Sequence, residues 1–205
     1  MQGYIININR ARDEDLIVTI LTPTKLKTTY RFYGARHSTI NLGYKIDFEP
    51  QHSIKSSIPQ LRDVLHLAQP WNRDRDRMYV WQTFIRLFYP HLKEIETLDS
   101  FYFDLLEECT HKWAKQNPKR IAIEAYTKLL EYEGRLHVEA HCFFCDSSIT
   151  GPTALARGFL PAHPACIFSD HLDALHVKHL MEEKSTLFFH DDQIEHLWKV
   201  LLEGL

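Results

Sequence analysis

The pattern of hydrophobic and polar positions divides the chain into a β-rich part and a helical part. Ile and Val recur in "GYIINI" and "DLIVTIL", and the charged residues "RARDED" between them predict a hairpin. The stretch "KLKTTYRFYGA" alternates basic with apolar or aromatic residues, as a half-exposed strand does. We expect two further short strands, "KIDFEP" ended by Pro50 and "HSIKSSI" ended by Pro59. Five short strands this close together predict an OB-type β-barrel.

From residue 60 to about residue 140 the pattern becomes helical. Long apolar stretches without internal Gly occur in "MYVWQTFIRLFYPHL", "LDSFYFDLLEECTHKWAKQ" and "KRIAIEAYTKLLEYE", the last followed by Gly134. Cys109 falls in this pattern and reads as a small core residue. A weaker helix is expected over "HLDALHVKHLM". The C-terminal segment is clearly amphipathic, with Asp191 or Asp192 as the expected N-cap. Its apolar stripe consists of Ile194, Leu197, Trp198, Leu201 and Leu202.

Two pairs of potential metal ligands with equal spacing follow the helical part. Cys142-x2-Cys145 forms a knuckle, and His163-x2-Cys166 follows after a gap of 17 residues. Four such ligands suit tetrahedral Zn²⁺ and leave no open position, so the site would be structural. The enclosed tract "SSITGPTALARG" has little apolar content, so we expect metal binding to supply part of the folding energy. His171 is an alternative to His163 as the fourth ligand.

These elements predict an α+β protein: an OB-type barrel, then a helical domain with an inserted zinc-knuckle element. We expect the barrel over residues 1–75 and the helical domain over 76–140. The zinc-binding element would span 141–170, and the helices of 171–205 would pack on the helical domain. The stretch "QPWNRDRDRM" (69–78) is the candidate linker, either a solvated loop or a helix start with Asp74 and Asp76 near the N-terminal dipole.

Composition narrows the class of protein. The 205 residues are 44% hydrophobic, and no apolar run is long enough to span a bilayer. No secretory signal is visible, so we expect a cytoplasmic protein, in which four cysteines favour metal or free thiols over disulfides. The net charge of −3 is unevenly distributed, since residues 1–80 hold 12 Lys and Arg against 8 Asp and Glu. A basic N-terminal part is suggestive of a nucleic-acid partner.

Basic residues alternate with aromatic ones between residues 25 and 45. Lys25, Lys27 and Arg31 share parity, and Gly34 permits a turn that projects the next cations. Such cations can follow a phosphate backbone while rings stack on unpaired bases, but an edge strand protected against aggregation would look the same. The candidate DNA-contacting residues are Lys25, Lys27, Arg31, Arg36, His37 and Lys45.

The chain lacks the motifs of common catalytic sites. It has no G-x-x-x-x-G-K-[ST] loop and no G-x-S-x-G elbow, and its seven Gly leave little for phosphate-cradling loops. We therefore expect a binding protein and not an enzyme, with no small-molecule substrate and no membrane partner.

The order of these parts resembles the bacterial RecO recombination and DNA-repair family. The "LLEYEGRLHVEAHCFFC" stretch is similar to a later landmark of that family, a helix end followed by C-x-x-C. The N-terminal likeness rests on Gly3, on Glu14-Asp15-Leu16, on Leu21-Thr22, and on the turn Arg31-Phe-Tyr-Gly34-Ala35-Arg36. Basic residues downstream of the cysteines are sparse, with Arg157 and Lys178 isolated.

The resemblance implies a DNA-binding mediator of the RecF-type pathway, cytoplasmic and nucleoid-associated. Such proteins bind single- and double-stranded DNA, anneal complementary strands, bind the single-strand-binding protein, and act with RecR to load recombinase. The aromatic run Trp81, Phe84, Phe88 and Tyr89 is then either plain core or a part-exposed groove for the tail of the single-strand-binding protein. The alternative function is a scaffold with a structural zinc site and no DNA binding, whose basic strand docks an acidic protein.

Overall fold

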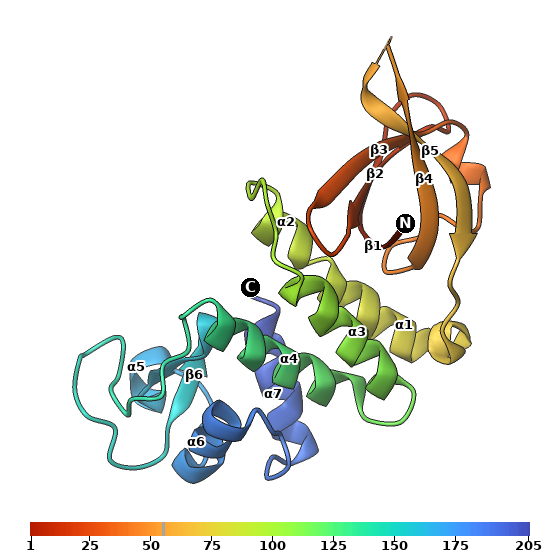
Figure 1. Ribbon diagram of the computed structural model, residues 1–205. Coiled ribbons are helices and arrows are strands. Elements are labelled where there is room, and N and C mark those ends of the chain that lie inside the picture. The colour runs from red at the N-terminus through yellow and green to blue at the C-terminus, as the bar shows by residue number, and fades with distance from the viewer. Residues whose placement is uncertain (55) are drawn as a thin grey trace. The chain divides into compact units, whose positions relative to one another are not determined.

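The computed structural model describes residues 1–54 and 56–205. Contacts within the chain group these residues into two compact units, 1–114 and 115–205, which are described one at a time (Figure 1). The first unit holds the strands of a barrel and three helices, and the second holds the cysteine pairs. The finer four-part division expected from the sequence stays a prediction.

The N-terminal strands form a closed barrel with the order β1-β2-β3-β5-β4. The strands β3 and β5 run parallel, and the other neighbouring pairs are antiparallel. The five-stranded OB-type barrel predicted from the alternation is therefore confirmed. Its strands are β1 (Gln2–Arg10), β2 (Leu16–Leu21), β3 (Leu26–Arg31), β4 (Lys45–Ser53) and β5 (Ser56–His66).

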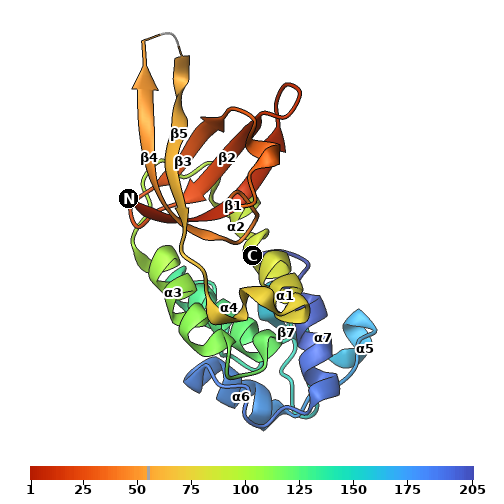
Figure 2. The same ribbon diagram turned by 90° about the vertical axis from the view of Figure 1, so that its right-hand side faces the viewer.

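The expected ends of the last two strands are wrong. Strand β4 continues past Pro50, and β5 includes Pro59, so neither proline ends a strand. Pro50 lies opposite Leu61, and the register of the pair shifts on both sides of it. A proline lacks an N–H and is tolerated at such irregular positions. The expected strand 52–58 therefore overlaps the hairpin between β4 and β5, which extends beyond the barrel in Figure 2; Lys55 lies outside the described residues.

The barrel core comes from the residues that the alternation pointed inward. Strand β1 is an exception, since Tyr4, Ile5 and Ile6 are all buried. The Tyr4 ring lies 5.9 Å from that of Trp81 and 5.6 Å from that of Phe103, so helices cover the outer face of this strand. The core cluster is Ile5, Leu16, Val18, Ile20, Ile40, Ile46, Phe48 and Leu61.

The candidate linker is a helix start, one of the two expected alternatives. The side chain of Asp74 accepts hydrogen bonds from the backbone N–H groups of Asp76 and Arg77, both at 3.1 Å, and so caps α1 (Arg75–Ile85). Trp71, in the 3₁₀ turn η2 (Pro70–Arg73), is buried with its ring 5.3 Å from that of Trp81. This segment therefore contributes to the core of the first unit.

The aromatic run in the helices is core, one of the two expected alternatives, and not an exposed groove. Trp81, Phe84 and Phe88 are fully buried in α1 and α2 (Phe88–Leu92), while Tyr89 is half-buried. The run exceeds one stripe because its rings meet those of several other elements, including Trp113 in α3 (Phe101–Trp113). Cys109 is buried in α3, as expected.

The second unit is built from four helices and a small hairpin. Its elements are α4 (Pro118–Tyr132), β6 (Ala154–Ala156), η3 (Arg157–Phe159), β7 (Leu160–Ala162), α5 (Pro164–Ile167), α6 (Ala174–Glu183) and α7 (Asp191–Leu201). The amphipathic C-terminal helix is confirmed, but its N-cap is His190, whose N–H donates to Gln193 at 3.0 Å. Both expected caps, Asp191 and Asp192, lie in the first turn, where Asp191 pairs with Arg120 at 2.9 Å.

The tract between the cysteine pairs contributes to a core, contrary to expectation. Thr153, Ala154 and Leu155 are buried, and β6 pairs antiparallel with β7. Ile149 packs in a small cluster with Cys142 and Ala162. The sequence pattern hid this because each buried stretch is only a few residues long.

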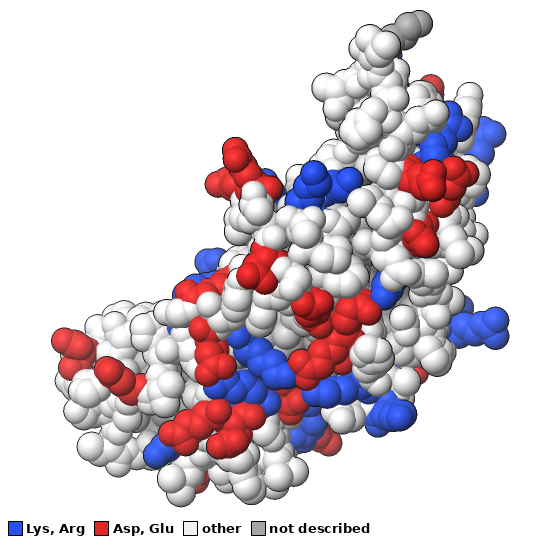
Figure 3. Space-filling model, viewed as in Figure 1, with Lys and Arg blue, Asp and Glu red and all other residues white. Residues whose placement is uncertain are grey.

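Charged side chains on α4 are mostly neutralised by neighbours. Lys119 pairs with Glu195 at 2.5 Å, and Lys184 pairs with Glu131 at 2.5 Å. Figure 3 accordingly shows basic and acidic side chains interspersed over this part of the surface.

Within the described residues, no helix is long and apolar enough to cross a membrane.

Candidate nucleic-acid interface and metal centre

The Gly-Ala-Arg turn is clasped to the hairpin turn between β1 and β2. A Cβ on Gly34 would lie 2.9 Å from Leu16 Cγ, so only glycine allows this approach. The Ala35 N–H donates to Glu14 O at 2.9 Å, and the Arg36 guanidinium pairs with the Glu14 carboxylate. Two motifs that are separate in the sequence, Glu14-Asp15-Leu16 and Gly34-Ala35-Arg36, thus pack as one structural unit, which we call the clasp. The second motif forms the 3₁₀ turn η1 (Gly34–Arg36).

Asp15 fixes the same clasp through its carboxylate. One oxygen accepts from the Tyr30 hydroxyl at 2.6 Å, and the other accepts from the Tyr33 N–H at 2.7 Å. These hydrogen bonds, that of Tyr30 first, lower the pKa of Asp15 below its usual value. The ionised carboxylate therefore holds Tyr33 at the start of the turn. The backbone of Tyr33 is in the left-handed region there, with a φ of 52°.

A groove of about 400 Å³ opens beside the turn. The exposed rings of Phe32 and Tyr33 line it, together with three cationic or titratable side chains: Arg31, His37 and Arg62. They come from β3, from the segment after η1 and from β5, and the parallel pairing of Tyr30 with Gln60 brings β5 alongside. Cations beside exposed rings are the combination that binds a phosphate backbone and stacks its bases.

Arg31 points inward and is only partly satisfied. In the pairing of β3 with β2, Arg31 lies opposite Leu16, which is buried. The Arg31 Nη1 donates to Leu61 O at 2.7 Å. Its Nε is buried and finds no hydrogen-bond partner in the described part of the chain. A buried donor without a partner costs free energy.

The remaining sequence-predicted cations divide into three places. Lys25 and Lys27 lie together at the other end of β3, and partial burial and then the charge of Lys25 lower the pKa of Lys27. Arg36 is exposed but paired with Glu14. Lys45 donates to Glu107 at 2.8 Å and is largely buried, with only 12% of its side chain exposed.

The structure thus groups Arg31 with His37 and adds Arg62, which the sequence analysis missed. Arg62 stands beyond Pro59, where a strand end was expected, and it reaches the groove only through the parallel pairing of β3 with β5. Its own neighbourhood in the sequence carries no signal for this.

The second candidate site is the group of Cys142, Cys145, His163 and Cys166. One ligand atom from each residue lies within 4.8 Å of all the others. The Nδ1 atom of His163 is 3.4 Å from the Cys145 sulfur and 3.9 Å from the Cys166 sulfur. Zn–S and Zn–N bonds of usual length in a tetrahedron separate such atoms by about 3.6 Å. The four side chains therefore fit a zinc ion, and His171 lies outside the group.

Contacts around the group orient its histidine for a metal. The other ring nitrogen of His163, Nε2, lies 3.3 Å from the carbonyl oxygen of Ser148. A carbonyl only accepts, so Nε2 carries the proton and Nδ1 keeps its lone pair directed at the sulfurs. The knuckle itself is folded by the Asp146 N–H, which donates to Cys142 O at 2.8 Å.

The thiols differ in how readily they ionise. Burial disfavours the Cys142 thiolate, but hydrogen bonds from the backbone N–H groups of His163, Cys145 and Phe144 outweigh it and lower the pKa to about 6. Several interactions lower the pKa of Cys145, and the backbone hydrogen bond of Ser147 is the largest of them. Burial raises the pKa of Cys166 to about 11. A thiolate at Cys142 is the form that binds a metal ion.

Comparison with known proteins identifies the N-terminal part of the chain. Residues 1–72 match the family model described as RecO N terminal. A search of curated proteins gave no match. The matched range covers all five barrel strands and the clasp of Gly34-Ala35-Arg36 on Glu14-Asp15-Leu16. Residues 1–72, which include the barrel, are therefore similar to the N-terminal domain of RecO, and the resemblance to the RecO family is confirmed over that range.

Proposed function

We propose that this protein is a recombination mediator of DNA repair that binds and anneals single-stranded DNA. The observation that carries the proposal is the groove beside the clasp, on a domain that matches the RecO model. Arg31 and Arg62 would hold phosphates, and Phe32 and Tyr33 would stack on bases. Lys25 and Lys27 would extend the contact along β3, a strand of about 20 Å.

Lys45 is left out of the proposed surface, because its ammonium is held by Glu107 and by the rings of Tyr4 and Phe103. Arg36 stays in it as a secondary contact, since its partner Glu14 is itself exposed. An exposed ion pair contributes little free energy, so a phosphate can compete for the guanidinium.

We propose zinc as the metal of the Cys142, Cys145, His163 and Cys166 group. Four protein ligands leave no open position, so the ion would staple the segment between the two ligand pairs and take no part in a reaction. When bound, it would supply folding energy only. This agrees with a mediator that has no catalytic role.

The family relation extends the proposal to partners. The protein would act in the RecF-type pathway with RecR and with the single-strand-binding protein, and would aid recombinase loading, in the cytoplasm near the nucleoid. The barrel would supply the DNA contact, and the helices after residue 75 would brace it and receive these partners.

Fluorescence anisotropy with labelled single-stranded DNA across a salt series tests the DNA contact. Arg62→Ala should weaken binding by about tenfold, as for loss of a charge-assisted hydrogen bond. It should also reduce the slope of log affinity against log salt by about 0.7. Arg73→Ala, an exposed arginine of the same unit outside the groove, is the matched control. Equal binding by both variants would refute the groove. A wild-type protein that binds no DNA at low salt would favour the scaffold function instead.

A further inference from the structure

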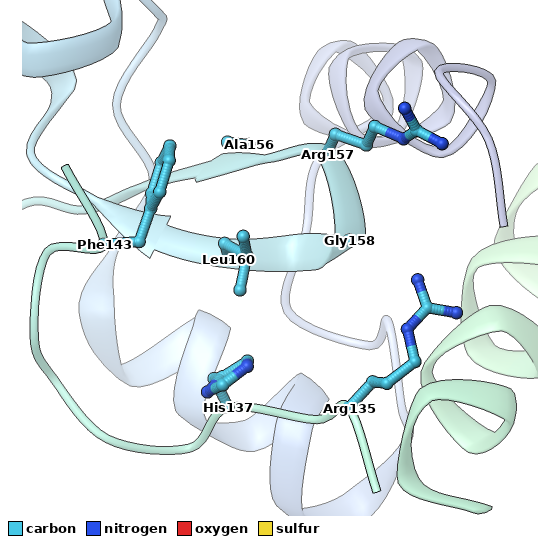
Figure 4. A pocket seen from close by; sticks show the side chains of 7 residues that line it. All are labelled: Arg135, His137, Phe143, Ala156, Arg157, Gly158 and Leu160. Atoms are coloured by element: carbon cyan, nitrogen blue, oxygen red, sulfur yellow. The ribbon is translucent and has the colours of Figure 1, made fainter. Parts of the chain in front are cut away.

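A second basic pocket is lined entirely by residues of the second unit, outside the range 1–72 that matches the RecO N-terminal model. Its volume is about 410 Å³, within the range of small-ligand sites. Figure 4 shows the guanidiniums of Arg135 and Arg157 toward one end and the ring of Phe143 toward the other, with Leu160 between. His137 and Gly158 complete the lining used here. In the sequence Arg157 is an isolated cation, and only the fold brings Arg135 to it.

The two arginines are positioned by backbone structure. Gly134 ends α4 with a φ of 68°, which lets the Arg135 N–H donate to Leu130 O at 2.8 Å. Arg157 stands in the turn between β6 and β7. Glu133 accepts from Arg135 Nη1 at 2.7 Å, which leaves the rest of that guanidinium for a ligand. The described residues place no ion pair on Arg157.

The apolar end is held by the cysteine knuckle. Phe143 follows the buried Cys142, and its N–H donates to Pro161 O at 2.9 Å. The residue is nevertheless 49% exposed. A ring that is fixed at its backbone yet open to solvent offers a stacking platform at little cost in conformational entropy.

We propose that this pocket binds one nucleotide unit of single-stranded DNA, with the phosphate between Arg135 and Arg157 and the base against Phe143. The choice of ligand rests on the proposed function, because the barrel groove has the same set of side chains: two arginines, one histidine and exposed aromatic carbon. The pocket itself is a separate site on a separate unit.

Charge favours a short contact over a long nucleic-acid track. Residues 115–205 hold 9 Lys and Arg against 13 Asp and Glu, so the unit as a whole repels a polyanion. The pocket is a local exception. A phosphate offers more acceptor oxygens to two guanidinium forks than a peptide carboxylate does, which favours the nucleotide over an acidic peptide. The same phosphate and base come from a free nucleotide or from a strand.

Chemical-shift mapping of the full-length, ¹⁵N-labelled protein tests the pocket directly and separately from the barrel. The ligands are inorganic phosphate, thymidine monophosphate and a four-residue thymidine oligonucleotide. We expect the oligonucleotide to shift the Gly158 and Phe143 amides, the monophosphate to do so at higher concentration, and phosphate alone to shift Gly158 only. Arg157→Gln should weaken the effect at these amides by about tenfold and leave the shifts at Phe32 and Arg62 unchanged.

Phe143→Leu should lose the nucleotide effect but keep the phosphate effect, since only the ring is removed. Lys199→Gln, an exposed cation of the same unit outside the pocket, should change nothing. Shifts confined to the barrel groove would overturn the pocket and leave the proposed function standing. Shifts at Gly158 without any at Phe32 or Arg62 would overturn the barrel surface instead. An acidic peptide that moves Gly158 where the oligonucleotide does not would refute the nucleotide.

Discussion

The sequence and the structure assign different roles to Lys45. The sequence predicts a contact with DNA, whereas the structure indicates a stabilising ion pair. Its Nζ lies 2.8 Å from Glu107 Oε2, and 5.9 Å and 5.7 Å from the ring centres of Tyr4 and Phe103. Only 12% of the Lys45 side chain and 27% of the Glu107 side chain are exposed. The pair joins the barrel strand β4 to the helix α3 within the first unit.

Lys45→Met keeps the length of the side chain and removes its charge, so Glu107 is left without its cation. Breaking a fully buried pair costs about 3–5 kcal/mol, and an exposed pair contributes about 0–1 kcal/mol. With Glu107 partly exposed, we expect a loss of about 2 kcal/mol in the free energy of unfolding. For a unit of this size that lowers the melting temperature by about 8 °C.

Urea denaturation followed by tryptophan fluorescence measures this loss, since Trp71, Trp81 and Trp113 all lie in the first unit. The double variant Lys45→Met with Glu107→Gln should recover about 1 kcal/mol, because no charge is then left unpaired. Lys25→Met, an exposed lysine of the same barrel, is the control, with unchanged stability and weakened DNA binding. The reasoning fails if Lys45→Met retains wild-type stability, and more so if it weakens DNA binding as Lys25→Met does.

Three further predictions concern the metal, the clasp and alkaline pH. The purified protein should carry about one zinc per chain by elemental analysis, and Cys142→Ser should release it and lower thermal stability, whereas metal-free wild-type protein would contradict this. Gly34→Ala should destabilise the protein by about 1–3 kcal/mol through the contact with Leu16, while Gly151→Ala, with open space at its Cβ, should not. Burial, and then the hydrogen bond to Glu107, raise the pKa of Tyr4 above its usual 10.0. The folded state therefore keeps a proton that the unfolded chain loses, so stability holds below pH 10 and falls above it, and urea midpoints of Tyr4→Phe should fall less steeply there.

The sequence predicts the parts of the fold that depend on local pattern. Ile and Val alternation places the first strands, and Asp74 marks the start of α1, because both signals act over a few residues. The prediction that β4 ends at Pro50 is wrong because Pro50 sits at a register irregularity, where the missing N–H costs little. Whether a proline ends a strand depends on its partner across the sheet, and the sequence does not contain that information.

The two candidate sites differ in the same way. Cys142, Cys145, His163 and Cys166 were found from spacing, since a knuckle brings its own ligands together. The barrel groove was found only in part, because Arg62 joins it through strand pairing. Lys45 and its partner Glu107 are 62 residues apart in the chain, so nothing local indicates that this lysine is already paired.

Arg36 provides the last test, because its charge is held by a neighbour that can be removed. Its guanidinium pairs with Glu14 although 65% of the Arg36 side chain and 41% of the Glu14 side chain are exposed. A pair this exposed contributes about 0–1 kcal/mol, so the clasp itself rests on backbone contacts such as Ala35 N–H to Glu14 O.

Glu14→Gln should therefore leave the clasp folded while it frees Arg36 and removes a negative charge beside the groove. We expect single-stranded DNA to bind about two- to fivefold more tightly, the reverse of the effect of most surface substitutions. The salt slope should steepen by up to about 0.7, because Arg36 then contacts phosphate without competition from Glu14. Arg36→Ala in the same background should abolish the gain, and Glu49→Gln, an exposed carboxylate of β4, should give none of it. If Glu14→Gln binds DNA with an unchanged slope, Arg36 lies outside the DNA path and the turn serves only to hold the barrel together.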